Sequence, residues 1–545
     1  MKKKILFGKR YQVITGMVLV FALFIVLILS AVAAGPGSEF DIIIKNGLVF
    51  DGTGKAGYKA DIGIADGKIV AIGAITLNQT ATVIDADGDI VAPGFIDMHS
   101  HADKKILELP TAENLIFQGI TSVLGGNCGG SKWPIGEFLK EFEAKGTSLN
   151  VAMLVGHGNI RRAAMKDPDC VSTDAEILVM QDLVEQAMKE GAFGISTGLE
   201  YMPGRMASTE ELIALAKRAG QFGGIFTSHM RCEDATLLNS VREIIEIGAK
   251  SGTPVEISHW KAAGAEQWGQ GKVVSAMLLT ARALGVDITA DQYPYNAMSC
   301  GLGWEFPAWA LKGGTDPLVK RLADPALYDR IWKYVRNHRK TITGEDMSNV
   351  IIARYNHNPD LEGKTFAEVL IDRGLEPTLD NGTDLIIELH TTGGCSVIDF
   401  AMDEDDIKVI MRNPYVMVGS DSAVREFGKG SPHPRNYGAF PRMISHYIND
   451  QFVLTLEEAI RKMTSLPAER ISLEDRGVIK EGNWADIVIF DELAIKDTAT
   501  FANPHQYPEG IHYVIVNGVV TADHGRHTGA KAGMALYGPA TIGKD

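Results

Sequence analysis

The residues of this sequence with the clearest chemical potential are histidines, a cysteine and an aspartate, each following an apolar, β-rich run. They are His99, His101, Cys128, His229, His259 and Asp421. In a (β/α)8 barrel, the carboxyl ends of the strands and the loops after them form the active face, so side chains from separate strands can meet there. Imidazole, thiolate and carboxylate groups together suit zinc, which in hydrolases keeps a position open for the water that it activates. The pattern therefore predicts a metal-dependent hydrolase.

Two of these histidines lie two positions apart, as His99 and His101. On an extended strand, residues two apart point the same way, so both imidazoles can reach one ion. A His-x-His pair alone is a weak signal, and the further ligands later in the chain strengthen it. His157, between two glycines, is a competing ligand for which we favour a structural or supporting role.

Cys128 and Asp421 each have a structural alternative. A lone buried cysteine usually behaves as a small hydrophobic residue, but Cys128 stands between Gly-Asn and Gly-Gly at a strand end, which favours metal ligation and loss of the thiol proton. Asp421 could be a helix N-cap. With the other ligands present, we expect it to take a proton from water and return it to the leaving amine, work commonly worth ~10²–10⁴-fold in rate.

The apolar runs alternate with helical stretches and are predicted to be the strands of the barrel. They lie at 95–98, 121–124, 151–155, 193–196, 225–228, 255–258, 286–290 and 416–420. The segment 208–220 is a predicted helix, with Ser208 as N-cap and Glu211 completing a capping box. The interval 296–415 is too long for one connection, so we expect part of it, near 300–350, to form an inserted lid or subdomain.

Both ends of the globular part are rich in short strands. Residues 41–92 contain apolar runs separated by Asn-Gly and Asp-Gly turns, and residues 476–540 contain further β-rich runs. We expect the two ends to build one small β-sandwich beside a barrel at 93–475. The predicted fold class is therefore α/β: a (β/α)8 TIM-like barrel with a β-sandwich domain from both chain ends and an inserted lid subdomain.

The N-terminus departs from this globular pattern. Three lysines at 2–4 and a Lys-Arg pair at 9–10 precede an uncharged, mainly apolar run at 13–34. The run is long enough to span a bilayer, and the basic residues before it would stay cytoplasmic. The small residues at 31–33 also fit the cleavage site of a secretory signal. Residues 1–35 are thus predicted to be a signal peptide or a membrane anchor, with the catalytic domain outside the cytoplasm and membrane contact limited to this segment.

Net charge and cysteine usage exclude other classes of protein. The formal net charge of −15 argues against nucleic acid as the main partner. The five cysteines are scattered and contain no CxxC pair. This usage favours neither a disulfide framework nor a cysteine-only zinc cluster.

A set of short motifs is spread along the chain between residues 92 and 442. The first is Ala-Pro-Gly-Phe-Ile-Asp-Met-His-Ser-His-Ala-Asp at 92–103. The others are Gly-Asn-Cys-Gly at 126–129, Gly-Leu-Glu-Tyr at 198–201, Ser-His-Met-Arg at 228–231, Ile-Ser-His at 257–259, Tyr-Pro-Tyr at 293–295, Gly-Ser-Asp-Ser at 419–422 and His-Pro-Arg-x-x-Gly-x-Phe-Pro-Arg at 433–442. Together these motifs resemble the amidohydrolase superfamily and, within it, the D-aminoacylase family. The resemblance covers about residues 41 to 535 and leaves out only the N-terminal segment.

The resemblance implies how the ligands divide between two metal positions. Cys128, His229 and His259 would hold a tight zinc ion, and His99, His101 and Asp421 would face a second, weaker or vacant site. Many binuclear amidohydrolases bridge their metals with a carboxylated lysine. No well-placed lysine follows the fourth predicted strand, and in the D-aminoacylase pattern a cysteine supplies that bond.

Substrate recognition needs a cation for the free carboxylate of an N-acyl amino acid. Arg435 offers a planar fork suited to a carboxylate, and Lys261 and Arg442 are spare candidates. The family resemblance adds Tyr201, Tyr293 and Ser299, which would hold the carboxylate or the amide oxygen.

The resemblance implies zinc-dependent hydrolysis of N-acyl-D-amino acids to a carboxylate and a free D-amino acid. The preference for the D enantiomer comes from the resemblance alone. One alternative is a cyclic amidase of the hydantoinase or dihydroorotase type, against which Cys128 and the missing lysine argue. The other is a catalytically silent scaffold, which would be expected to have lost metal ligands. Zinc content and a panel of linear and cyclic substrates separate the three.

Overall fold

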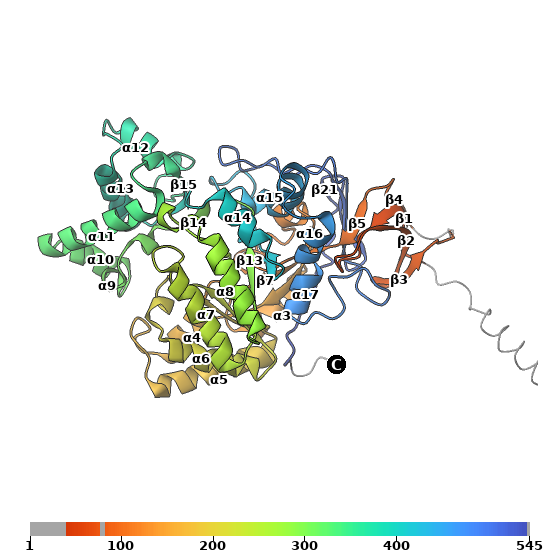
Figure 1. The fold of residues 1–545 in the computed structure, drawn as a ribbon, viewed down its shortest axis with the longest axis horizontal. Coiled ribbons are helices and arrows are strands. Elements are labelled where there is room, and N and C mark those ends of the chain that lie inside the picture. Colours follow the sequence, from red (N-terminus) through yellow and green to blue (C-terminus); the bar gives the residue numbers. More distant parts are fainter. Residues whose placement is uncertain (1–39, 77–81, 542–545) are drawn as a thin grey trace, which may run out of the picture.

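Short parallel strands lie at the centre of the fold (Figure 1). The structure is a computed structural model that describes residues 40–76 and 82–541. The predicted export segment at 13–34 lies outside the described residues. Within them, no helix combines the length and apolarity that crossing a membrane requires.

The barrel strands form two parallel sheets that meet at both seams. The first consists of β6 (Phe95–Asp97), β7 (Ile120–Gly125) and β8 (Asn150–Met153). The second runs in the order β17 (Val416–Val418), β13 (Ile288–Gln292), β12 (Val255–Ile257), β11 (Ile225–His229), β10 (Gly194–Gly198) and β9 (Val155–Gly156). Only Leu154 separates β8 from β9, and a parallel bridge between Ser100 and Ser422 joins the ends of β6 and β17. The predicted barrel is confirmed.

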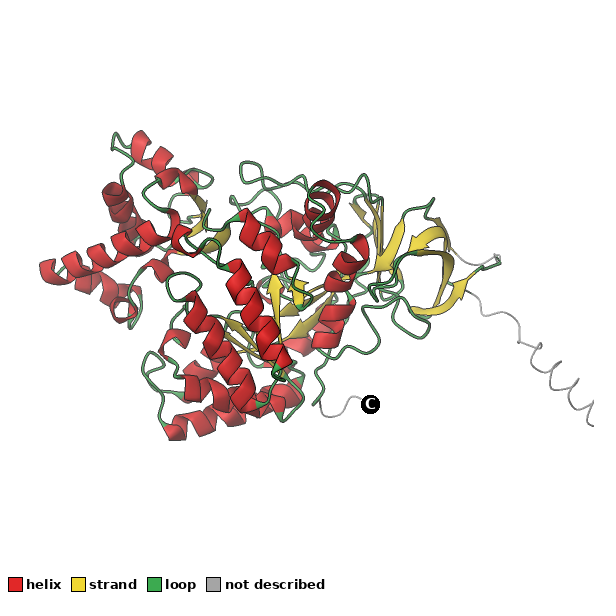
Figure 2. Cartoon of the chain, viewed as in Figure 1, coloured by secondary structure: helices red, strands yellow, loops and turns green. Residues whose placement is uncertain are grey.

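Helices surround these strands (Figure 2), and their buried apolar residues pack with those of the strands in one core. They are α2 (Glu113–Ile116), α3 (Ile135–Lys145), α4 (His157–Ala164), α5 (Asp174–Glu190), α6 (Thr209–Gly220), α7 (Leu237–Ser251), α8 (Gly271–Ala283), α14 (Glu404–Met411), α15 (Arg435–Arg442), α16 (Leu456–Met463) and α17 (Ser465–Arg470), with a π-helix at Met443–Asp450. The strands are buried on both faces, as parallel strands under helices are.

The predicted helix at 208–220 forms, but only half of its capping box does. The Ser208 hydroxyl accepts from the Glu211 backbone N–H at 3.2 Å. The Glu211 carboxylate does not return to the N-cap, because Arg161, His157 and Ser172 all donate to it. His157 therefore lies in a buried ion-pair cluster, in the structural role that we favoured for it.

Both ends of the chain contribute to one nine-stranded sheet. It contains β1 (Ile42–Val49), β2 (Tyr58–Ala65), β3 (Lys68–Gly73), β4 (Thr82–Asp85), β5 (Ile90–Pro93), β18 (Ile487–Phe490), β19 (Ile511–Val516), β20 (Val519–Asp523) and β21 (Arg526–His527). The two ends meet where β5 pairs antiparallel with β18. Isoleucines from both ends fill its core.

An inserted unit with its own core lies at the opposite end of the molecule from this sheet (Figure 1). Its sheet is β14 (Met298–Gly301), β16 (Ser396–Asp399) and β15 (Val350–Arg354), and its helices are α9 (Ala308–Leu311), α10 (Thr315–Leu322), α11 (Pro325–Thr343), α12 (Phe366–Asp372) and α13 (Leu379–Thr391). The unit is larger than the predicted insertion near 300–350. It extends to β16, because β16 pairs antiparallel with β14 and so completes its sheet.

Candidate active site

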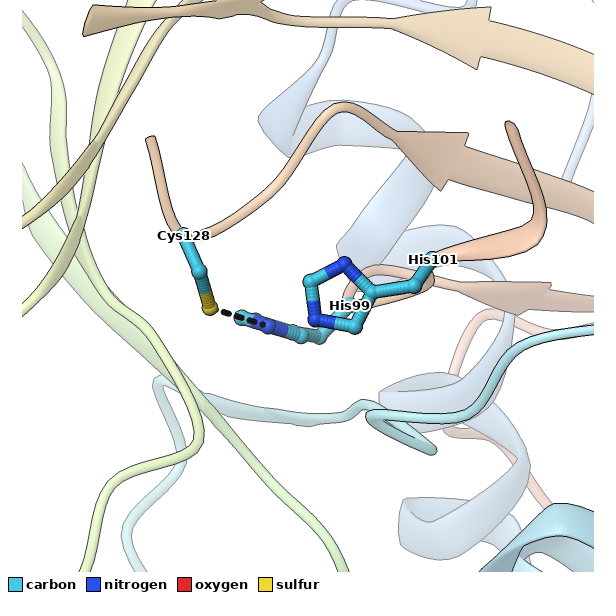
Figure 3. Close-up of side chains that lie close together, drawn as sticks. All are labelled: His99, His101 and Cys128. Atoms are coloured by element: carbon cyan, nitrogen blue, oxygen red, sulfur yellow. Dashed lines mark hydrogen bonds between the residues drawn. The ribbon is translucent and has the colours of Figure 1, made fainter. Parts of the chain in front are cut away.

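The six predicted ligands meet at the carboxyl ends of the barrel strands. His99 and His101 follow β6, Cys128 follows β7 and His229 ends β11. His259 and Asp421 follow β12 and β17. Figure 3 shows His99, His101 and Cys128 converging from two neighbouring strands. Residues separated by more than 300 positions thus share one site, as the barrel geometry requires.

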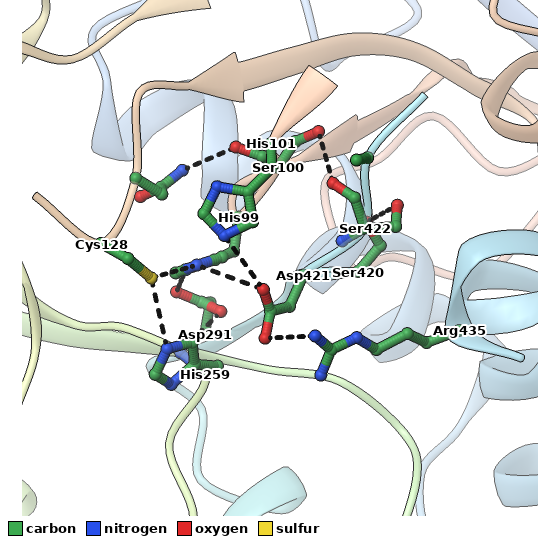
Figure 4. Close-up of polar contacts among 12 residues, drawn as sticks. His99, Ser100, His101, Cys128, His259, Asp291, Ser420, Asp421, Ser422 and Arg435 are labelled. Carbon is green, nitrogen blue, oxygen red and sulfur yellow. Dashed lines mark hydrogen bonds and ion pairs between the residues drawn. The ribbon is translucent and has the colours of Figure 1, made fainter. Parts of the chain in front are cut away.

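The Cys128 sulfur lies between two imidazole rings (Figure 4). His99 Nε2 is 3.2 Å from Sγ and His259 Nε2 is 3.5 Å from it. Two overlapping groups, Cys128 with His229 and His259, and His99 with His259 and Asp421, each offer one ligand atom per residue within 4.8 Å of one another. The arrangement can accommodate one metal ion beside the thiolate and a second one beside Asp421.

Carboxylates behind the ligands orient two of these rings. His99 Nδ1 lies 3.3 Å from Asp291 Oδ2, and His259 Nδ1 lies 3.0 Å from Glu233 Oε1. Lys261 Nζ, which pairs with the same Glu233, lies 2.8 Å from His259 Nδ1. Each ring is held through Nδ1, so its Nε2 points towards the sulfur. Such outer contacts commonly fix the tautomer and orientation of metal-bound histidines.

Buried ring nitrogens without a hydrogen-bond partner indicate whether the cluster fits a metal ion. Among the described residues, His229 Nδ1 and His101 Nδ1 are buried and have no hydrogen-bond partner. A buried polar atom without a partner is costly, and a metal ion would satisfy a ring nitrogen. The donor set of one sulfur and several imidazole nitrogens matches the preferences of zinc. The residues therefore fit this metal.

The electrostatics of the site favour a thiolate and a carboxylate. Burial would raise the pKa of the Cys128 thiol, but His99 and His259 hold it well below the usual range. Burial would likewise raise the pKa of Asp421, and Arg435, with His101 and His99, holds it well below its usual value. Asp421 therefore stays charged and able to accept a proton at neutral pH.

Three of the ligand residues have left-handed backbone conformations. The φ angles are +55° at Cys128, +35° at His259 and +48° at Asp421. This region is strained for residues with a Cβ, and such strain clusters at functional sites. Each strained residue is the one that turns a side chain from the end of its strand into the centre of the barrel.

Arg435 is the cation closest to Asp421. Its Nη2 lies 2.9 Å from Asp421 Oδ2 (Figure 4). Its guanidinium carbon lies over the Tyr293 ring, 4.6 Å from the ring centroid. Its Nε and Nη1 are buried without a partner among the described residues. The guanidinium can thus hold Asp421 and still donate to a ligand.

A cavity of about 450 Å³ opens over this cluster. The predicted substrate-binding residues Tyr201, Tyr293, Ser299 and Arg435 all line it. The inserted unit contributes Ser299 from β14 and Trp304, so it covers the active face. The spare cations differ in position: Lys261 lines the cavity and pairs with Glu233 at 2.6 Å, whereas Arg442 pairs with Asp497 outside it.

Four polar residues of the site had no role in the sequence prediction. Asp291, the penultimate residue of β13, accepts from the His259 backbone N–H at 2.9 Å, while Glu200 lies 3.0 Å from His229 Nε2. Glu233 and Arg425 line the cavity. Both Asp291 and Glu200 do have a sequence signal. Asp291 directly follows the predicted strand at 286–290, and Glu200 lies in the Gly-Leu-Glu-Tyr motif at 198–201. Glu233 and Arg425 lie in loops where only the tertiary structure brings them to the site.

Comparisons with known proteins agree with this geometry. A profile described as "Amidohydrolase family" matches residues 82–522. D-aminoacylase of Alcaligenes xylosoxydans xylosoxydans is 34% identical over 520 residues, covering 91% of this chain and 97% of that protein. N-acyl-D-glutamate deacylase of the same organism is 34% identical over 502 residues, covering 88% and 93%.

A solved structure of N-acyl-D-glutamate deacylase from Bordetella bronchiseptica is similar to this chain in fold as well as in sequence. It matches with a TM-score of 0.78 and 32% identity, over 92% of this chain and 100% of that one. That structure is a complex with zinc and a phosphonate inhibitor that mimics the tetrahedral intermediate of the reaction.

Proposed function

The chain belongs to the amidohydrolase family, and we propose that it is a zinc-dependent hydrolase that converts N-acyl-D-amino acids to a carboxylate and a free D-amino acid. The observation that carries this proposal is one cavity holding a Cys-His-His cluster, a charged aspartate and an arginine with unpartnered donors. The names of the relatives support the linear amide and the D configuration.

Cys128, His229 and His259 would hold the tight zinc ion, and His99, His101 and Asp421 a second, weaker one. When bound, zinc supplies Lewis acidity that polarises an amide carbonyl and activates water at neutral pH. The histidine-orienting carboxylates Asp291 and Glu233 keep the ligand set in place before substrate arrives.

Asp421 is the residue that moves the proton. It is charged, lines the cavity and lies at the carboxyl end of the barrel. It accepts a proton from the attacking water and delivers it to the amide nitrogen, which leaves as an amine. General acid–base work of this kind needs a group within reach of both atoms.

Arg435 holds the free carboxylate of the substrate. Its unpartnered Nε and Nη1 are charge-assisted donors, and its stacking on Tyr293 fixes the plane of the fork. Tyr201 and Ser299 line the same cavity and would hold the amide oxygen or the carboxylate.

The test of this function is zinc content followed by release of free amine from three kinds of substrate. We expect stoichiometric zinc and turnover of N-acyl-D-amino acids, with little turnover of the L enantiomers or of hydantoins and dihydroorotate. Preference for the cyclic amides would replace the proposal with a cyclic amidase. Absence of both zinc and turnover would favour a silent scaffold.

We expect Arg435→Ala to reduce kcat/KM on an N-acyl-D-amino acid by about ten- to a hundredfold beyond its effect on the corresponding amidated substrate. A charge-assisted hydrogen bond contributes roughly 1.5–3 kcal/mol, which corresponds to that range. Arg435→Lys should recover only part, since a point charge cannot reproduce the planar fork.

The amidated substrate is needed because Arg435 also supports Asp421. The loss of kcat/KM that both substrates share measures the support that Arg435 gives to Asp421. The additional loss of kcat/KM on the free acid measures binding of the substrate carboxylate. Equal losses on the two substrates would mean that Arg435 acts only through Asp421.

We also propose that the protein is exported or membrane-anchored, on the basis of the uncharged run at 13–34 behind a basic start. In its native host we expect it in the membrane fraction, or outside the cytoplasm with an N-terminus near Ala34. An unprocessed protein in the cytosolic fraction would contradict both forms of the proposal.

A further inference from the structure

The charged residues that line the catalytic cavity are not balanced. Its acids all have partners: Glu200 pairs with His229, Glu233 with Lys261, and Asp421 with Arg435. Three further cations line the same cavity, namely Lys104, Lys105 and Arg425. None of these three forms an ion pair with an acidic side chain among the described residues.

This excess of positive charge is local. The chain as a whole carries a formal net charge of −15, so most surfaces of this protein are expected to repel anions. A cavity lined by unpaired cations in such a protein instead concentrates anions at its mouth. The cavity is therefore suited to a ligand that carries more negative charge than one carboxylate.

Arg425 is the best-defined of the three cations. Its backbone N–H donates to Asn114 Oδ1 at 3.0 Å and its Nε donates to Asn436 Oδ1 at 3.0 Å. These neutral amides fix the side chain without neutralising its charge, and no hydrogen bond from its terminal nitrogens to a described residue is formed. Burial, and then the nearby charge of Arg435, lower the pKa of Arg425.

A held, half-buried guanidinium without an acid is stabilised when an anion binds beside it. Arg435 is already shared between Asp421 and the carboxylate that we assign to it. The α-carboxylate of the substrate therefore does not account for Arg425, Lys104 and Lys105.

We propose that the cavity recognises N-acyl-D-amino acids carrying a second anionic group, with Arg425 as its principal partner and Lys104 and Lys105 at its rim. This inference rests on the proposed function and names its substrate class. The second anionic group can come from the side chain of the amino acid or from a dicarboxylic acyl group, because both chemistries present a carboxylate to the same cations.

The experiment compares acidic substrates with neutral isosteres. One arm uses N-acetyl-D-glutamate against N-acetyl-D-glutamine, and the other uses N-succinyl-D-leucine against its succinic monoamide. We expect at least one acidic substrate to exceed its isostere in kcat/KM by about ten- to a hundredfold, and the arm in which this occurs identifies the source of the anion.

Substitution of Arg425 tests the assignment within that arm. Arg425→Gln should lower the ratio of acidic to neutral kcat/KM towards one, and Arg425→Lys should recover part of it. The matched control is Arg354→Gln, since Arg354 lies close enough to influence Arg425 but bonds to Asn356 and does not line the cavity. It should leave the ratio unchanged.

Two results would overturn the inference while leaving the proposed function intact: wild-type turnover of the neutral substrates without preference in either arm, or an equal loss on acidic and neutral substrates in Arg425→Gln. Failure of wild type to hydrolyse any linear N-acyl-D-amino acid would instead overturn the proposed function itself.

Discussion

Asp421→Asn should reduce kcat by about two orders of magnitude or more while the tight zinc ion remains bound. The replacement preserves the size of the side chain and its contact with Arg435, but an amide cannot accept a proton. The reduction follows from the charge of Asp421, whose low pKa Arg435 and His101 maintain despite burial. Zinc should remain because the Cys128, His229 and His259 group does not include Asp421.

The measurements are steady-state kinetics and zinc content on the same preparation. Asp497→Asn is the matched control, because Asp497 also pairs with an arginine, Arg442, at 3.0 Å but lies outside the cavity. The Asp497→Asn variant should hydrolyse the substrate at close to the wild-type rate. Near-normal turnover of Asp421→Asn would exclude this residue as the proton carrier.

Cys128→Ala should lose most bound zinc and, with it, activity. The sulfur lies within 3.5 Å of the Nε2 atoms of both His99 and His259, so the substitution removes the thiolate from the centre of the cluster. Loss of a residue that merely orients a ligand typically costs 10–100-fold in metal affinity or activity, and loss of a ligand should cost at least as much. Alanine also carries a Cβ, so the left-handed backbone at this position is equally strained in both proteins.

Zinc should be measured after extensive dialysis, with circular dichroism to establish that the barrel still folds. Cys300→Ala provides the control, since Cys300 lines the same cavity and belongs to none of the candidate metal groups. Its zinc content should match wild type. Full zinc occupancy in Cys128→Ala would remove Cys128 from the ligand set.

The strained conformations at Cys128, His259 and Asp421 link the chemistry to the fold. The surrounding strands are buried, Asp291 accepts from the His259 backbone, and Arg435 pairs with Asp421; the Cys128 sulfur contacts His99 and His259. A residue held in such a conformation is already oriented before substrate or metal binds, which is the advantage of a rigid site.

The sequence alone was sufficient for the strands of the barrel and for the ligands at their ends. Buried strands are recognisable as short apolar runs, and strand ends in a barrel share one face. His99, His229 and Asp421 could therefore be assigned to one site although they lie on strands distant in sequence. The pairing of both chain ends was also expected from their turns and apolar runs, and β5 and β18 supply the contact.

Only the tertiary structure decided which charges remain unpaired. No sequence pattern indicates that Glu233 forms an ion pair with Lys261 or that Asp421 forms one with Arg435. Nor does a pattern indicate that Glu211 pairs with Arg161 instead of capping its own helix. These pairings join residues from different loops and helices, and loop paths carry no periodicity that a sequence pattern can reveal. Charge balance in a cavity is a property of side chains brought together by the whole fold, so the unpaired Arg425 could be recognised only in three dimensions.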